Sequence, residues 1–241
     1  MNTNDININQ NLNSPMYAES DSNARRSFIT ATYLNLFMGV VAFVIANYLL
    51  IASGAAKVIT QFFYGNIWIS VIAAIAFGFV TSFFLNFTAS NNSKAVQYFG
   101  LFSFAAIEAV FVVPVIYFAA SFRPALLAPA TFFTLGFFLL MTGIVYFTGI
   151  DFSFLRSFLM FAGIASLVIL IVSLFAGFNL GIFFTGFLIL LSCGYILYDT
   201  SQVLNNYNAN QSVAAATALL GSIVMLFVNI LQFLMQMFGN E

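Results

Sequence analysis

The sequence contains no histidine and only one cysteine, and these absences exclude several kinds of site. Without histidine the chain cannot form a Ser-His-Asp triad, use imidazole as a general acid or base, or offer the commonest protein ligand of zinc. The single cysteine, Cys193, has no second cysteine in this chain with which to form a disulfide, and it lies in an apolar run. We interpret it as a small packing residue.

Charged residues are also scarce. They make up 5% of the 241 residues, whereas 62% are hydrophobic, and the mean hydropathy is +1.03. A soluble domain carries about a quarter charged residues, so most of this protein's surface is expected to contact lipid. The net charge of −1 also lacks the basic footprint of a nucleic-acid-binding protein. The expected partner is therefore the lipid bilayer, and no nucleic-acid partner is expected.

Seven apolar stretches are long enough to cross a bilayer, which takes about 20 mostly apolar residues per helix. Short polar segments such as NFTASNNSK and SFRPA separate them. The stretches do not alternate in polarity as the strands of a membrane β-barrel do. The predicted fold is an all-α integral membrane protein, a bundle of seven transmembrane helices. The predicted spans are 28–52, 67–85, 96–120, 126–148, 154–176, 181–199 and 213–238.

The residues before the first span are polar and rich in asparagine. They contain too few apolar side chains to fold alone, and they lack the basic start and apolar centre of a secretory signal. We therefore expect a disordered tail over residues 1–24 and a transmembrane domain over residues 25–241.

The basic residues predict the orientation of the bundle. Seven spans place four of the six basic residues on the side of the N-terminal tail, and Lys57 and Arg123 on the other side. Basic residues favour the cytoplasmic side of a membrane, so we expect a cytosolic N-terminus. The four are Arg25, Arg26, Lys94 and Arg156.

Two of the seven acidic residues, Glu108 and Asp199, fall within or against apolar runs. An aspartate at the centre of a span costs about 2.5–3.5 kcal/mol on insertion scales, and less near the ends. Neither residue has a basic partner within its own span. Each must therefore be protonated, hydrogen-bonded or reached by water, and an ionisable side chain in a membrane is by default a functional candidate.

Polar residues in two spans form stripes at helical spacing. Such stripes are expected to face the bundle interior, where they line a cavity or hold helices together at about 0.6–2 kcal/mol each. For the last span we favour the second role. For Asp199 we favour function, because asparagine would hold helices together at lower cost; Glu108 fits either reading. The stripe in the sixth span is Ser192, Tyr195, Asp199 and Gln202, and that in the last span is Ser222, Asn229, Gln232 and Gln236.

Three segments together resemble a known family. They are the tyrosine-aspartate-threonine sequence at 198–200, TGIDFSFLRSFLMFAG at 148–163 and LFVNILQFLMQMFG at 226–239. In order and spacing they resemble the Bax inhibitor-1 family of transmembrane Bax-inhibitor-motif proteins, over residues 28–239. The resemblance implies a seven-helix fold with a cytosolic N-terminus. Asp151 of the second segment is also a good residue to cap the fifth span.

The resemblance implies one of two activities. Some members are pH-sensitive calcium leak channels, in which an aspartate of the sixth span pairs with one of the seventh. Asp199 matches the first aspartate, but Leu226 occupies the place of the second, so that paired switch cannot be built in the same way. Asp199 is then the expected titrating group and cation ligand, with Glu108, Ser192 and the last span's stripe as further oxygen donors. No cofactor is expected, and Ca²⁺ would be the permeant ion.

The alternative is a modulator that binds a membrane-anchored ATP-dependent protease. A bacterial branch of the family resembles a modulator of the FtsH protease and tolerates loss of the second aspartate, and the short C-terminus fits that branch. The expected location is then a bacterial plasma (inner) membrane, and the N-terminal tail is a candidate contact for the protease. We expect no enzymatic activity, because an intramembrane protease needs two catalytic aspartates and the spans offer Asp199 and Glu108 alone.

Overall fold

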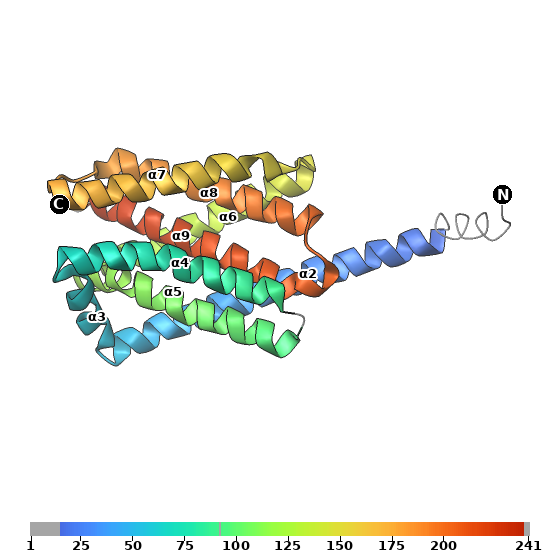
Figure 1. The fold of residues 1–241 in the computed structure, drawn as a ribbon, viewed down its shortest axis with the longest axis horizontal. Coiled ribbons are helices and arrows are strands. Elements are labelled where there is room, and N and C mark those ends of the chain that lie inside the picture. The colour runs from blue at the N-terminus through green and yellow to red at the C-terminus, as the bar shows by residue number, and fades with distance from the viewer. Residues whose placement is uncertain (1–14, 92, 239–241) are drawn as a thin grey trace.

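The computed structural model describes residues 15–91 and 93–238, and Figure 1 shows their arrangement. These residues form helices and no strand. Seven of the helices are long and apolar enough to span a membrane, which confirms the predicted all-α membrane bundle. They are α2 (Pro15–Ala52), α4 (Ile67–Ser90), α5 (Lys94–Phe122), α6 (Leu127–Thr148), α7 (Leu155–Ala176), α8 (Gly181–Asn205) and α9 (Ser212–Phe238).

The shorter elements lie in the connections between spans. The helix α3 (Ala55–Tyr64) was not predicted, because its ten residues are too few to cross a bilayer. Gly54 precedes it with a φ of 78°, a left-handed conformation that suits glycine and lets the chain turn sharply after α2. In Figure 1 α3 lies at the end of the bundle opposite the N-terminus, where it packs on α5 and α4. The 3₁₀ turns are η1 (Pro124–Leu126), η2 (Phe152–Phe154) and η3 (Ala209–Gln211).

The first helix begins before the first predicted span. A disordered tail was expected over residues 1–24, but α2 begins at Pro15, whose fixed φ suits the first position of a helix. Residues 15–24 are helical because they continue a strong apolar helix and need not fold alone; residues 1–14 lie outside the described part of the chain. The 38 residues of α2 reach about 57 Å at 1.5 Å per residue. Figure 1 shows its N-terminal part projecting beyond the bundle.

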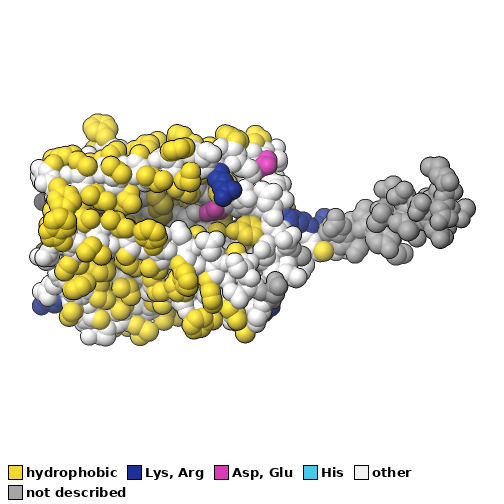
Figure 2. All heavy atoms as spheres, viewed as in Figure 1, with side chains coloured by type: hydrophobic (Ala, Val, Ile, Leu, Met, Phe, Trp, Pro, Cys, Tyr) yellow, Lys and Arg dark blue, Asp and Glu magenta, His cyan; other side chains and the backbone are white. Residues whose placement is uncertain are grey.

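The core of the bundle surrounds α9. This helix contacts α2, α4, α5, α6 and α8, and most of its residues are buried. The outer surface is covered by exposed apolar side chains, seen as the yellow area of Figure 2. Phe183, for example, is 90% exposed. So many exposed apolar side chains are favourable in lipid but not in water. Thr217, Ser222 and Asn229 of α9 are buried and face the interior, and α8 is the main neighbour of this helix.

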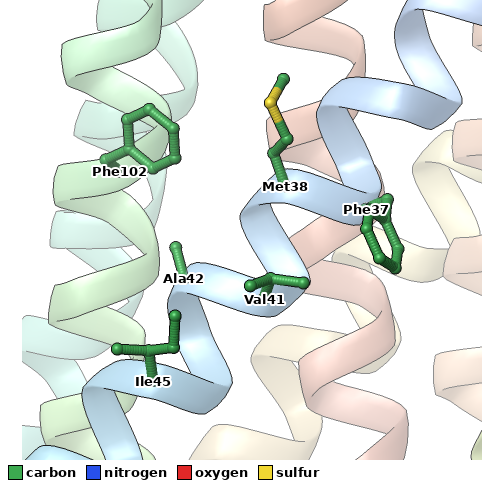
Figure 3. A pocket seen from close by; sticks show the side chains of 6 residues that line it. All are labelled: Phe37, Met38, Val41, Ala42, Ile45 and Phe102. Atoms are coloured by element: carbon green, nitrogen blue, oxygen red, sulfur yellow. The ribbon is translucent and has the colours of Figure 1, made fainter.

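A shallow groove between α2 and α5 opens on this apolar surface (Figure 3). Its lining carries no polar side chain, so it offers nothing to orient a polar ligand. We interpret it as part of the lipid-facing surface. It is lined by Phe37, Met38, Val41, Ala42, Ile45 and Phe102.

Candidate functional site

The helices α8 and α9 run antiparallel and are joined by three hydrogen-bonded side-chain pairs. Gln236 Nε2 donates to Thr185 Oγ1 at 2.8 Å, and Asn229 Nδ2 donates to Ser192 Oγ at 2.9 Å. Ser222 Oγ donates to Asp199 Oδ2 in the third pair. On each helix the members recur every seven residues, close to the 7.2 residues of two helical turns. One straight stripe on each helix therefore meets the other, and we name the three pairs the polar ladder.

The middle pair of the polar ladder is fully enclosed. Ser192 and Asn229 are both buried, and Ser192 Oγ donates to the Leu188 carbonyl at 2.7 Å. Asn229 Nδ2 reaches the same carbonyl at 3.3 Å. Each amide and hydroxyl hydrogen used here has an acceptor, as buried polar groups require. This is the geometry expected of side chains that hold two helices together.

The Asp199 pair is less enclosed. Asp199 is half-buried, while its donor Ser222 is buried. Asp199 therefore combines a contact across the helix pair with partial access from outside, which the middle pair lacks.

Two residues predicted to share the Asp199 face contact other elements. Tyr195 donates from its hydroxyl to the Leu159 carbonyl of α7 at 2.9 Å. Gln202 Nε2 donates to Ser153 Oγ of η2 at 2.8 Å. Positions seven apart on a helix nearly coincide in direction, whereas positions three apart differ by about 60°. The predicted face is therefore divided: Ser192 and Asp199 face α9, and the other two residues face α7 and its leading turn.

Two glycines permit the close approach of α7 and α8. A Cβ atom on Gly163 would lie 2.8 Å from the Tyr195 hydroxyl, and one on Gly194 would lie 2.8 Å from Leu159 Cδ2. Real Cβ atoms do not make such short contacts, so a side chain at Gly163 would displace the Tyr195 hydroxyl, and one at Gly194 would displace the Leu159 side chain. Small residues at helix interfaces are typical of membrane bundles. Neither glycine was predicted from the sequence to lie at a helix contact.

Glu108 lies outside the polar ladder. It is 3% exposed on α5, and Thr81 Oγ1 of α4 donates to its Oε1 at 3.2 Å. The expected oxygen set of Asp199 and Glu108 is therefore not seen as one hydrogen-bonded group. Among the described residues there is also no cluster of three or more acidic, cysteine or histidine side chains that could hold a metal ion. A cation site at Asp199 stays a prediction that depends on one carboxylate.

Two further positions on α9 complete the comparison with the predicted stripe. Gln232 is half-buried and takes no part in the polar ladder. Leu226 is fully buried and belongs to the hydrophobic core. It lies one helical turn from Ser222, on the way to the middle pair. Leucine therefore fills the place where the resemblance expected a second aspartate.

Asp151 caps the turn that leads into α7, as predicted. Its Oδ1 accepts from Ser153 Oγ at 2.6 Å, from the Ser153 backbone N–H at 2.9 Å and from Ser201 Oγ of α8 at 3.1 Å. The bond from the Ser153 hydroxyl, followed by that from its backbone, lowers the pKa of the Asp151 carboxyl below its ordinary value. Phe152 N–H donates to Ser201 Oγ at 2.8 Å. This cap therefore also fastens η2 to α8, two residues beyond Asp199, a link that the sequence did not reveal.

Comparison with known proteins agrees with this architecture. The family described as "Inhibitor of apoptosis-promoting Bax1" matches residues 25–240. The chain is 31% identical to the Bax inhibitor 1 of Schizosaccharomyces pombe over 148 residues. This alignment covers 60% of this chain and 54% of the yeast protein. It is 38% identical over 94 residues to a BI1-like protein of Arabidopsis thaliana, covering 36% of this chain and 35% of the relative. The Protein LIFEGUARD 1 of that plant is 34% identical over 85 residues, or 34% of this chain and 36% of the relative.

These alignments span at most about half the length of the relatives, so they establish kinship without assigning an activity. The family match, in contrast, runs from residue 25 to residue 240 and so includes all but the first residues of the seven spans. It includes Asp199, the Asp151 cap and the last helix. The chain belongs to the Bax inhibitor family of integral membrane proteins.

Proposed function

We propose that this membrane protein is a pH-sensitive cation leak in which Asp199 is the titrating group. The observation that carries the proposal is the Asp199–Ser222 contact, in which a half-buried carboxylate inside a span accepts a hydrogen bond from the neighbouring helix. An ionised carboxylate can only accept hydrogen bonds, whereas a protonated one also donates. Gain or loss of one proton therefore changes the hydrogen bonding between α8 and α9.

The surroundings of Asp199 support a role beyond holding helices together. The other two pairs of the polar ladder use only neutral groups, and they show that hydroxyls and amides suffice to join α8 to α9. A carboxylate at the remaining pair is costlier in a membrane and is not needed for that purpose. It does supply an oxygen ligand of the kind that hard cations such as Ca²⁺ prefer.

Calcium flux into reconstituted vesicles tests the proposal. The wild-type protein is expected to conduct Ca²⁺ with a pH dependence between pH 6 and 8. Asp199→Asn keeps the size of the side chain and is expected to abolish that dependence. Glu108→Gln is the matched control, because it neutralises the other intramembrane acid while leaving an oxygen that can accept from Thr81.

Three results would contradict the leak. They are equal flux in the wild type and Asp199→Asn at every pH, no flux in either protein, and the same loss in Glu108→Gln as in Asp199→Asn. The last result would mean that neutralising any buried acid disturbs the bundle.

A second candidate function is supported by the N-terminal part of α2. The helix begins at Pro15, and its N-terminal part projects beyond the bundle (Figure 1). A projecting helix is a suitable contact for a membrane-anchored protease, which in a bacterial plasma membrane would be of the FtsH type. Mild-detergent purification of the full chain and of a variant lacking residues 2–22 tests this. Equal recovery of the protease with both proteins, or with neither, would exclude the extension as the contact.

A further inference from the structure

The C-terminal end of α8 has a carbonyl that its own helix does not satisfy. The N–H groups of Asn206 and Tyr207 both donate to the Gln202 carbonyl, at 2.9 and 3.1 Å. The Tyr207 N–H is the one that would ordinarily reach the Val203 carbonyl four residues earlier. Val203 is fully buried, so its carbonyl is poorly placed to find water. An unpaired backbone acceptor at such a place is costly.

Arg25 of α2 supplies the missing donor. Its Nη2 donates to the Val203 carbonyl at 2.7 Å, and its Nη1 donates to the Tyr207 carbonyl at 3.0 Å. The guanidinium also lies 5.1 Å from the centre of the buried Phe28 ring, which restricts its position. A cation at the C-terminus of a helix is favoured by the helix dipole. One arginine fork therefore caps α8 from a residue 178 positions earlier in the chain.

This cap is close to the proposed titrating group. Val203 follows Asp199 by four residues, so the two lie one turn apart on α8. Tyr207 lies in the loop after α8. Burial raises the pKa of its hydroxyl, and the negative charge of Asp199 acts in the same direction. Arg25 itself lies on α2, ten positions after its first residue, Pro15, and so belongs to the N-terminal part of that helix.

We propose that Arg25 is a positioning residue that caps α8 from α2 and thereby sets the placement and proton affinity of Asp199. The inference builds on the proposed function and adds a link from the N-terminal extension to its titrating group. A partner that displaces the extension would move Arg25 and, through Val203, the helix that carries Asp199.

The other polar and charged side chains around Asp199 do not bind the α8 backbone at its C-terminal end. On α9 it meets Ser222, which donates to it. Charged or titratable groups on its own helix and on neighbouring elements are Tyr195, Tyr198, Tyr207, Asp151 and Arg156. Asp151 is held by Ser153 and Ser201, and Tyr195 by Leu159. Arg156 is exposed on α7. Arg25 differs from all of these because its guanidinium binds the α8 backbone.

The chain offers a native reporter and a matched control. Cys193 is its only cysteine and is buried on α8, so maleimide labelling reports the opening of that helix without an engineered thiol. Arg26, the neighbour of Arg25, is exposed and carries the same charge. Arg25→Gln removes the cation and the fork, Arg25→Lys keeps the charge but not the fork, and Arg26→Gln removes an equal charge next to the cap.

The experiment uses the full chain in vesicles. Arg25→Gln is expected to speed the labelling of Cys193 about fivefold, as loss of a buried contact does when labelling follows local opening. It should also shift the pH midpoint of Ca²⁺ flux by about half a unit, because the end of α8 that follows Asp199 loses its cap and the surroundings of the carboxylate change. Arg25→Lys should fall between Arg25→Gln and the wild type, and Arg26→Gln should match the wild type in both measurements.

Each other outcome overturns one of the two ideas. Unchanged labelling and an unchanged midpoint in Arg25→Gln reject the positioning role. Equal shifts in Arg25→Gln and Arg26→Gln also reject it, because a general surface charge would then suffice. If Arg25→Gln fails to insert, Arg25→Lys decides, and wild-type behaviour of that variant rejects the fork. If the wild type conducts nothing while labelling responds only at Arg25, the leak is rejected and the cap stands.

Discussion

Asn229 donates a hydrogen bond to Ser192 Oγ at 2.9 Å, and this pair lies midway between two others that join the same helices. Because the three pairs repeat every seven residues on both helices, they depend on one common register. A slide of α9 by one residue along α8 would break all of them together. The polar ladder therefore fixes the relative position of the helix that carries Asp199 and the helix that carries its donor, Ser222.

Asn229→Ala is expected to lower the free energy of unfolding by about 1 kcal/mol, within the range measured for interhelical hydrogen bonds in membranes. The loss is limited because Ser192 Oγ keeps its bond to the Leu188 carbonyl. Unfolding in mixed micelles, followed by circular dichroism, gives the value. Gln232→Ala is the control on the same helix, since Gln232 lies outside the polar ladder. Equal losses in the two variants would mean that the ladder adds no stability of its own.

Gly163→Ala is expected to destabilise the protein by about 1–3 kcal/mol, the usual cost of overpacking. The new methyl group would lie 2.8 Å from the Tyr195 hydroxyl and would break its bond to the Leu159 carbonyl. Tyr195→Phe removes the atom that clashes, so the double variant should be less destabilised than the sum of the single ones. Unfolding free energies of the four proteins form the cycle. Strict additivity would contradict the assigned contact.

The seven spans were predictable from sequence because each is a continuous apolar run long enough to cross the hydrocarbon layer. Asp199 was also recognisable, since an acid in an apolar run is rare. The partners were not recognisable. Ser201, Gly163 and Arg25 act through backbone atoms or through glycine's missing side chain, and these contacts join residues far apart in the chain. The division of the α8 face between α9 and α7 likewise depends on where the neighbouring helices pack, which helical spacing does not specify.

The Asp151 cap predicts a stability difference that disappears in acid. Bonds from Ser153 and Ser201 lower the pKa of the Asp151 carboxyl from its ordinary value of 3.8. A lowered folded-state pKa stabilises the fold above the unfolded value, and this contribution is lost as the pH falls through the folded value. Wild type should therefore melt above Asp151→Asn at pH 7, and the gap should shrink below about pH 4. A gap of constant size from pH 7 to pH 3 would show that the charge of Asp151 has no part in the cap.

Leu226 offers the strictest test of a single titrating carboxylate. It is fully buried on α9, one turn from Ser222, where the family resemblance expected an aspartate. Leu226→Asp and Leu226→Asn lose nearly the same packing, so their difference isolates the new charge. Two nearby carboxylates repel when both are ionised, so the Asp variant should lose stability relative to the Asn variant as the pH rises.

The same pair of variants tests the leak. If Asp199 titrates alone in the wild type, a second carboxylate beside it should make the two groups share protons, and the flux should respond to pH over a wider range. The Asn variant should keep the midpoint of the wild type, apart from any change in total flux. Flux in vesicles at several pH values, together with melting temperatures, separates the two effects. Identical pH profiles for Leu226→Asp and Leu226→Asn would mean that a charge at position 226 does not affect the protonation of Asp199. The flux would then depend on Asp199 without any contribution from this position of α9.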